Sequence, residues 1–183
     1  MADQSVAQNR VQIKNVEIAD IEIDTQQTPE LTYSGPKLKK TPRNRDWIEI
    51  DVEFEVEGKS ENKYVDELLF KYYLVLDDKK KTMVTADVIH VNVPLDEKIY
   101  SSVYLSPSTL EKLLRKKNFS KNDIKGYAVE VIYRGKTMGG DASNKSSKWW
   151  ESREQTTGLL LPKSRTPFAP LWWDRYAEEK PQD

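Results

Sequence analysis

Residues 47–57, WIEIDVEFEVE, alternate between apolar and acidic side chains almost without interruption. A strict period of two over this length predicts a β-strand with one buried face and one face toward water. Strands buried on both faces are continuous apolar runs, so the alternation favours an antiparallel β protein. The apolar set is Ile48, Ile50, Val52, Phe54 and Val56, and the acidic set is Glu49, Asp51, Glu53, Glu55 and Glu57.

Residues 11–24 carry a similar pattern whose phase slips twice. The apolar positions are 11 and 13, then 16 and 18, then 21 and 23. A one-residue slip turns the opposite face of a strand toward the core, so each break predicts a β-bulge or a kink.

Further alternating segments predict strands at 64–76, 82–93, 98–105 and 126–136, and we expect Trp149 and Trp150 on a last strand. Residues 139–148 are expected to form a flexible polar loop. Residues 106–118 predict the helix: Ser106 or Ser108 can cap it, and Glu111 follows Ser108 at capping-box spacing. The pattern predicts a mostly β protein, an immunoglobulin-like antiparallel β-sandwich of about seven strands with one short crossover helix.

The 183 residues suffice for one sizeable core. We expect residues 1–10 to be disordered, residues 11–158 to form the sandwich, and residues 159–183 to form a C-terminal strap packing on it. The strap is aromatic and therefore too apolar to trail in water, whereas Pro162, Pro167 and Pro170 prevent a continuous ladder strand.

Composition excludes several classes of function. Lys and Arg total 29 against 30 acidic residues, so there is no basic excess for binding nucleic acid or anionic membranes. Cysteine is absent, which excludes disulfides, thiolate catalysis and Cys-ligated zinc. No stretch approaches the roughly 20 apolar residues of a spanning helix, so no transmembrane segment is expected in this chain.

Two groups of polar residues are candidates for chemistry. His90 is the sole histidine and has no partner motif, so we expect a surface or hydrogen-bonded histidine. The row from Glu49 to Glu57 could bind Ca²⁺ or act as a pair of glycosidase carboxylates, since same-face neighbours stand about 6.5–7 Å apart. We expect instead a solvated face that is cross-paired to Lys and Arg. No catalytic, cofactor-binding or metal-binding residue is therefore predicted.

The Trp pairs are the strongest candidates for a binding surface. Each outward-facing Trp could pack under the tail, form a protein interface or stack on a sugar. The predicted interaction surface comprises Trp149, Trp150, Phe168, Trp172, Trp173 and Tyr176.

Residues from WIEIDVEFEVEGKSENKYVDELLFKYYLVLDDKK to VIHVNV, with the tail TPFAPLWWDRYAEEK, carry a family resemblance. Over residues 11–183 the chain resembles the immunoglobulin-like proteins of verrucomicrobial type IV pilus-like gene clusters. The resemblance implies a cell-envelope protein of a gut mucin-degrading bacterium, with a sandwich similar to archaeal pilus subunits and no catalytic role. Type IV pilins polymerise through an N-terminal apolar helix, which this sequence lacks, so we expect either a mature segment or an accessory protein.

The leading hypothesis is a non-enzymatic cell-envelope protein, located in the periplasm, outer membrane or cell surface, that acts through protein–protein contacts. Its partners would be proteins of a pilus-like assembly or further copies of itself, with no cofactor. The alternative is a carbohydrate-binding β-sandwich that takes mucin-type glycans on exposed Trp. A third hypothesis is a hydrolase built on the carboxylate row. The envelope location comes from the resemblance, and the residues alone leave the cytoplasm open.

Overall fold

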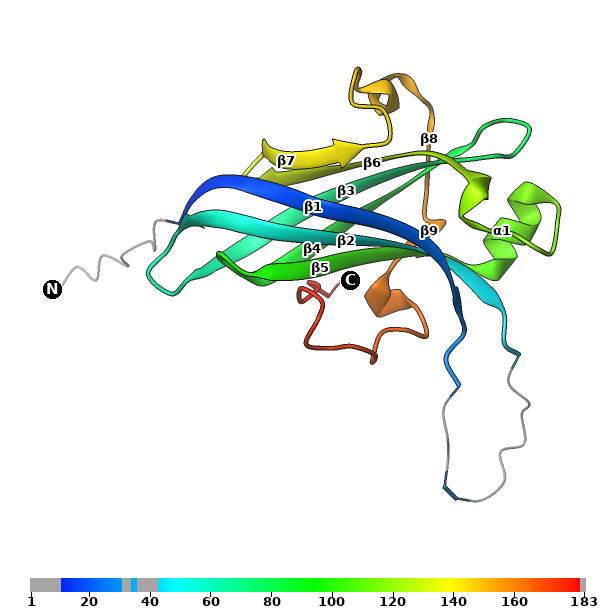
Figure 1. Ribbon diagram of the computed structural model, residues 1–183, viewed down its shortest axis with the longest axis horizontal. Helices are drawn as coiled ribbons and strands as arrows, with labels where there is room; N and C mark the ends of the chain where they lie inside the picture. The colour runs from blue at the N-terminus through cyan, green and yellow to red at the C-terminus, as the bar shows by residue number, and fades with distance from the viewer. Residues whose placement is uncertain (1–10, 31–33, 36–42, 182–183) are drawn as a thin grey trace, which may run out of the picture.

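The structure, a computed structural model, describes residues 11–30, 34–35 and 43–181. Two sheets pack face to face as a sandwich (Figure 1). The segment 1–10, for which disorder is expected, lies outside the described residues. Sheet A has the order β1 (Gln12–Gln27), β2 (Asp46–Lys59), β5 (Lys98–Leu105) and β9 (Leu160–Pro162). Sheet B has the order β7 (Lys136–Ala142), β6 (Ile124–Tyr133), β3 (Tyr64–Leu76), β4 (Met83–Pro94) and β8 (Gln155–Thr157).

The strand order is that of an immunoglobulin-like sandwich, so the predicted fold class is confirmed. Strands β1, β2 and β5 take the positions of A, B and E, while β7, β6 and β3 take those of G, F and C. Strand β4 lies beside β3, as the extra strand C′ does. Strand β9 occupies the place of D, although it comes from the C-terminal part of the chain.

The acidic-faced segment forms β2, as its alternation predicts. Its five apolar side chains, from Ile48 to Val56, are 0% exposed and face sheet B. Phe54 meets Phe70 of β3 across the interior, with ring centroids 4.7 Å apart. Burying large side chains on both inner faces is the main stabilising contribution in a sandwich of this kind.

Both predicted slips in the first strand are confirmed. The register between β1 and β2 shifts between Ile13 and Asn15, and again between Ile18 and Asp20. After the second shift β1 runs unbroken from residue 20 to residue 27. Gly139 of β7 lies against the first half of β1, where an added Cβ would stand 2.0 Å from the Val16 carbonyl oxygen.

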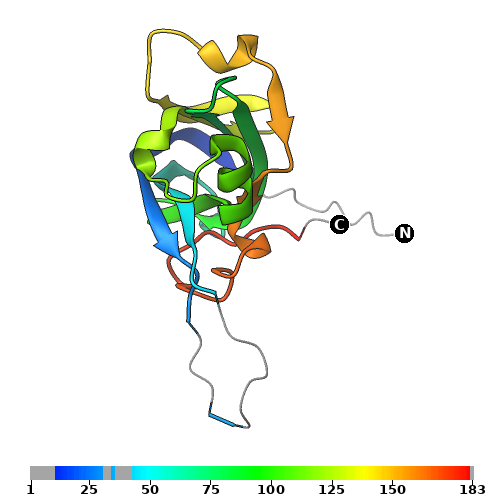
Figure 2. The ribbon, with the colours of Figure 1, turned by 90° about the vertical axis from the view of Figure 1, so that its right-hand side faces the viewer.

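The helix is shorter than the sequence pattern predicts. Helix α1 spans Pro107–Leu114, near one end of the sandwich (Figure 2). Ser106 caps it by accepting a hydrogen bond from the Thr109 N–H at 3.2 Å. Because Ser106 is the cap, Ser108 lies inside the helix and makes no capping box with Glu111, whose carboxylate pairs with Arg45 at 2.5 Å. Arg115, in the left-handed region at φ 56°, ends the helix.

Two predictions for residues 136–152 were wrong. Residues 136–142, part of which was expected to be a loop, form β7 on the edge of β6. Trp149 and Trp150 lie in a short 3-10 helix, η2 (Trp149–Ser152), and not on a strand. The signal for β7 was hidden because Gly139 and Gly140 have low strand propensity, yet close backbone approach requires both. Two other 3-10 helices are η1 (Lys121–Asp123) and η3 (Lys163–Arg165).

Candidate functional site

The described part of the C-terminal segment, residues 159–181, is called the strap. It lies along one side of the sandwich, in orange to red in Figures 1 and 2. The strap joins the edges of both sheets. Tyr100 of β5 donates its N–H to the Arg175 carbonyl at 3.2 Å and accepts from Ala177 at 2.8 Å. On the β4 edge, Val91 donates to the Glu178 carbonyl at 2.9 Å, and Lys180 donates to that of Ile89 at 2.8 Å.

An aromatic stack fixes the middle of the strap to the outer face of sheet A. Phe168 is 1% exposed and stacks on Tyr104 of β5, with centroids 4.7 Å apart and an interplanar angle of 11°. The edge of its ring meets Trp47 of β2 at 5.8 Å. Phe168 is therefore an anchor, not part of an accessible surface.

The strap covers two residues of the acidic row of β2. Glu49 is 7% exposed and Asp51 9% exposed, so the expected solvated face was wrong for these two residues. Tyr104 donates its hydroxyl to Glu49 at 2.5 Å, and Arg175 donates to Asp51 at 3.3 Å. Lys98 does form the expected kind of cross-strand pair with Glu53, at 2.8 Å.

Burial under the strap shifts the pKa of Asp51. Burial, reinforced by the neighbouring Glu49 carboxylate, raises the pKa of Asp51 to about 6. Asp51 Oδ1 has no hydrogen-bond partner among the described residues. Two of the five candidate glycosidase carboxylates, Glu49 and Asp51, thus lie under the strap.

Two cations of the strap are held against aromatic rings. Lys163 is buried, and its ammonium donates to the carbonyl oxygens of Ala169 at 3.0 Å and Leu171 at 2.6 Å. It also lies 4.9 Å from the centre of the Tyr176 ring, and burial lowers its pKa. The Arg175 guanidinium lies 3.7 Å above the Tyr100 ring. These contacts fix both ends of the loop 169–175.

That loop presents the second Trp pair to solvent. Trp172 is 50% exposed and Trp173 is 74% exposed. Trp172 has φ 54°, a conformation that is strained for a bulky side chain. Beside the loop lies a groove of about 480 Å³. Its lining includes Lys163, Ser164, Trp173, Tyr176 and Glu179.

The first Trp pair lies on the opposite outer face, that of sheet B. Trp150 is 7% exposed and stacks on Tyr73 of β3 at 5.9 Å. Trp149 is half-buried and meets the Trp150 ring edge-on at 5.5 Å. The six residues of the predicted interaction surface are therefore divided between two faces, and only Trp172 and Trp173 are exposed.

His90 lies in the interior, where it joins a chain of hydrogen bonds. Tyr72 donates to Ser101 Oγ at 2.5 Å, and Ser101 Oγ lies 2.6 Å from His90 Nε2. Nδ1 lies 3.3 Å from the Glu178 carbonyl oxygen of the strap. Burial lowers the pKa of His90 to about 4, which keeps the ring neutral near pH 7. Ser101 is 0% exposed, so this serine–histidine pair is closed to substrate in the described structure.

Among residues 11–30, 34–35 and 43–181, no three His, Cys, Asp or Glu side chains are grouped so as to hold a metal ion. Within the same residues, no helix has the length and apolar character needed to span a membrane.

Fold and site together define an immunoglobulin-like β-sandwich with an aromatic C-terminal strap. A protein-family model matches residues 7–183, and the chain belongs to that family. A crystal structure of a protein from Akkermansia muciniphila is similar, with a TM-score of 0.82 and 29% sequence identity. The match covers 95% of this chain and 96% of that one. Akkermansia is a verrucomicrobium, so the resemblance to a verrucomicrobial protein is confirmed at this level. No curated protein matches the chain.

Proposed function

We propose that this chain is a non-enzymatic protein of the cell envelope that binds other proteins, as a component or accessory of a type IV pilus-like assembly. The pilus context rests on the family resemblance of the sequence. The observation that carries the binding role is the solvent-exposed pair Trp172 and Trp173. Trp is enriched at the energetic centres of protein interfaces, where water is excluded around a rigid aromatic anchor.

The loop around this pair is built to hold its shape. Lys163 binds the carbonyl oxygens of residues 169 and 171, and Phe168 fixes the preceding turn in the aromatic stack. Backbone strain at Trp172 persists only where surrounding contacts over-determine the conformation, and such strain is concentrated at functional sites. A rigid loop that exposes two large apolar side chains supports a contact surface.

The remaining polar groups support the absence of catalysis. Glu49 and Asp51 lie beneath the strap, and Ser101 and His90 lie in the core. A nucleophile or acid that substrate cannot reach contributes nothing to turnover. On this proposal, changing Glu49 or Asp51 to Gln or Asn abolishes no hydrolysis of mucin-type glycans, because the wild-type protein has none.

Binding measured against a matched aromatic control tests the proposal. The probes are the pilus-like subunits encoded in the same genome, purified and immobilised one at a time. We expect at least one to bind the wild-type chain, and the double change Trp172→Ser and Trp173→Ser to weaken that binding tenfold or more. Tyr64→Ser, which removes another exposed aromatic (45% exposed) elsewhere, should leave it unchanged. No binding to any subunit, or equal binding by the double variant, would contradict the proposal.

A carbohydrate-binding role is the second candidate, because the groove beside Trp173 is lined by a second aromatic residue, Tyr176. Sugars stack on such platforms. The discriminating experiment titrates mucin oligosaccharides while the Trp fluorescence is recorded. We expect no saturable shift, and a shift that Trp173→Ala abolishes would put the glycan role first.

A further inference from the structure

The edges of the two sheets are unequally covered. The β4 edge pairs with β8 and with residues 178–180, and the β5 edge pairs with β9 and with residues 175–177. The β7 edge lies against the first half of β1 at Gly139. The second half of β1, residues 20–27, pairs with β2 on one side. On its other side it has no strand partner among the described residues.

This open edge borders a groove. The groove, of about 560 Å³, lies between the second half of β1 in sheet A and the start of β6 in sheet B. Ile21 and Ile23 line it from β1, and Ile124 and Tyr127 line it from β6. A strand added to β1 would lie about 4.8 Å away, and its inward side chains would enter this groove. The edge therefore combines backbone groups that pair with no strand and apolar contacts for alternate residues. The N–H groups of Ile21 and Thr25 donate to the carboxylates of Asp20 at 2.9 Å and Asp24 at 2.8 Å, bonds that an added strand would replace.

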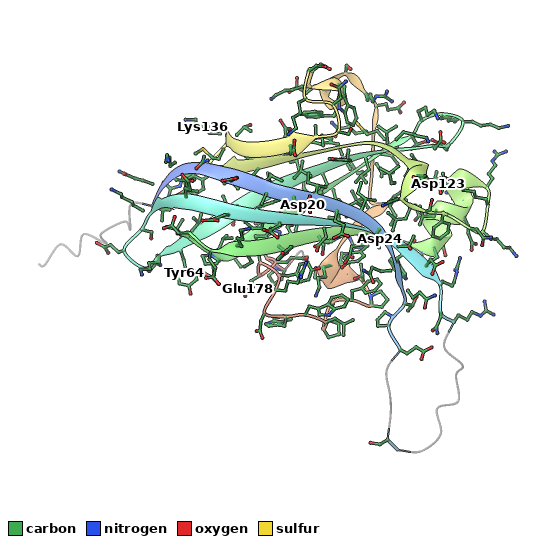
Figure 3. The ribbon with its side chains drawn as sticks, in the orientation of Figure 1. Asp20, Asp24, Tyr64, Asp123, Lys136 and Glu178 are labelled. Atoms are coloured by element: carbon green, nitrogen blue, oxygen red, sulfur yellow. The ribbon has the colours of Figure 1, made fainter. Side chains whose placement is uncertain are left out.

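The outward face of the same edge is strongly acidic. Four acid–acid pairs lie directly opposite one another on β1 and β2: Glu17 with Glu55, Asp20 with Glu53, Glu22 with Asp51, and Asp24 with Glu49. Like charges in this position are destabilising. On β2, Lys98 and Arg175 supply two counter-charges. On β1, no ion pair to any of the four acids is found within the described part of the chain. Figure 3 labels Asp20 and Asp24 on this strand.

We propose that residues Asp20 to Gln27 of β1 accept an extended segment of a partner protein by strand addition, and that this segment alternates basic and apolar residues. Its apolar side chains enter the groove beside Ile21 and Ile23. Its basic side chains lie beside Asp20, Glu22 and Asp24, which form no ion pair within the described part of the chain. Lys121 and Lys125 line the β6 side of the same groove, and Lys125 pairs with Asp77. A second copy of β1 is the wrong partner, because it would place a further row of carboxylates against this one.

The inference deepens the proposed binding role, but it concerns a surface on the opposite edge of sheet A from the strap and can fail independently. Charged residues also protect exposed sheet edges against unwanted pairing. The two roles differ in one measurable respect. A protective edge binds no strand of either charge, whereas a docking edge binds one of matching pattern.

The test uses a fluorescein-labelled peptide, Lys-Ile-Lys-Val-Lys-Ile-Lys-amide, titrated with the full chain at low salt while anisotropy is recorded. We expect saturable binding that weakens at least tenfold with each of three changes to the peptide. These are Glu in place of Lys, a scrambled order of the same residues, and N-methylation of alternate amides, which removes the ladder hydrogen bonds. Amide hydrogen exchange of the complex should slow within residues 20–27.

Charge reversal on the protein completes the test. The double change Glu22→Lys and Asp24→Lys should weaken the Lys peptide at least tenfold and gain binding of the Glu peptide. The control, Glu61→Lys with Glu97→Lys, makes the same change in net charge at exposed positions near the start of β1, at the other end of the strand from residues 20–27, and should leave both peptides unaffected. Thermal melts confirm that each variant is folded. Absence of saturable binding, or equal binding of the N-methylated peptide, overturns the inference, while contacts through Trp172 and Trp173 would stand.

Discussion

The two Trp-Trp pairs of this chain lie on opposite outer faces of the sandwich and differ in what lies beneath them. Trp150 rests on Tyr73 in an apolar cluster with Val75, Met83, Ala128 and Ala142. Trp172 and Trp173 project from a loop that is held by Lys163, bound to two backbone carbonyls, and by the stack of Phe168 on Tyr104. The first pair covers part of the outer face of sheet B and buries apolar surface. The second pair is exposed to solvent on a loop that other strap residues hold in place. The same dipeptide thus serves stability in one place and, on the proposed function, binding in the other.

The largest loss of stability is expected when Trp150 is truncated. Trp150→Ala removes a 7% exposed ring from its stack on Tyr73 and leaves a cavity over sheet B. Such truncations cost about 3–5 kcal/mol, and urea unfolding should show a loss of that size. A loss below about 1 kcal/mol would show that Trp150 is not a structural anchor. The half-buried Trp149 gives a matched control, and Trp149→Ala should cost less.

A similar effect, confined to the strap, is expected at Phe168. Phe168→Ala removes the ring stacked on Tyr104 and should cost about 3 kcal/mol, since the ring is 1% exposed. Because neighbouring strap contacts depend on this anchor, limited proteolysis should cut between residues 163 and 180 before the sandwich unfolds. Cleavage that begins in β1 to β6 instead would contradict the strap's dependence on Phe168.

A smaller effect is expected in the pH dependence of stability, to which Asp51 under the strap and His90 in the interior contribute. The pKa of Asp51 is raised from 3.8 to about 6 in the folded protein, so its stabilising contribution is complete below 3.8 and is lost as pH rises through 6. The pKa of His90 is lowered from 6.5 to about 4, so its contribution is present above 6.5 and is lost as pH falls toward 4. The two groups oppose each other between pH 4 and 6 and flatten the wild-type profile.

Asp51→Asn should therefore uncover the His90 contribution. The free energy of unfolding of this variant should fall, relative to the wild type, by on the order of 2 kcal/mol between pH 6.5 and pH 4. Trp150→Phe lies on the outer face of sheet B, away from Asp51. It should keep the wild-type pH dependence of the free energy of unfolding, at a lower overall stability. Urea unfolding at pH 4, 5, 6 and 7 checks both. If the free energy of unfolding of Asp51→Asn changed with pH just as that of the wild type does, Asp51 would not be titrating under the strap.

The alternation of apolar and polar side chains predicted the strands that bury one face against the other sheet. The alternation in β2 and both phase slips in β1 follow from side-chain periodicity, which the two sheets enforce by burying one face. Strand β7 was not predicted because Gly139 is required by the close approach of the β1 backbone. That contact joins two distant segments, so the local sequence does not reveal it. Helix α1 was predicted too long because Arg115 takes the left-handed conformation, which residue type alone does not indicate.

The candidate site was less predictable, since it depends on which face a distant segment covers. Glu49 and Asp51 share the alternation of Glu53 and Glu55, yet only the first two are buried, because the strap crosses the sheet there. Trp150 and Trp173 likewise belong to identical dipeptides. Their different exposure comes from a stack on Tyr73 in one case and a strained turn in the other. Sequence composition identified the right residue types, and long-range packing decided their roles.

One paired measurement tests the central claim, that the strap's Trp pair is for binding and the other pair is for stability. Wild type, Trp150→Ala and the Trp172→Ser, Trp173→Ser double variant are each assayed for urea unfolding and for affinity to a pilus-like subunit that binds the wild type. We expect Trp150→Ala to lose about 3–5 kcal/mol of stability and to keep its affinity. The double variant should stay within about 1 kcal/mol of wild type, since surface changes are small, and lose affinity tenfold or more. Equal affinity in the double variant, or a stability loss as large as that of Trp150→Ala, would show that the two pairs do not divide these roles.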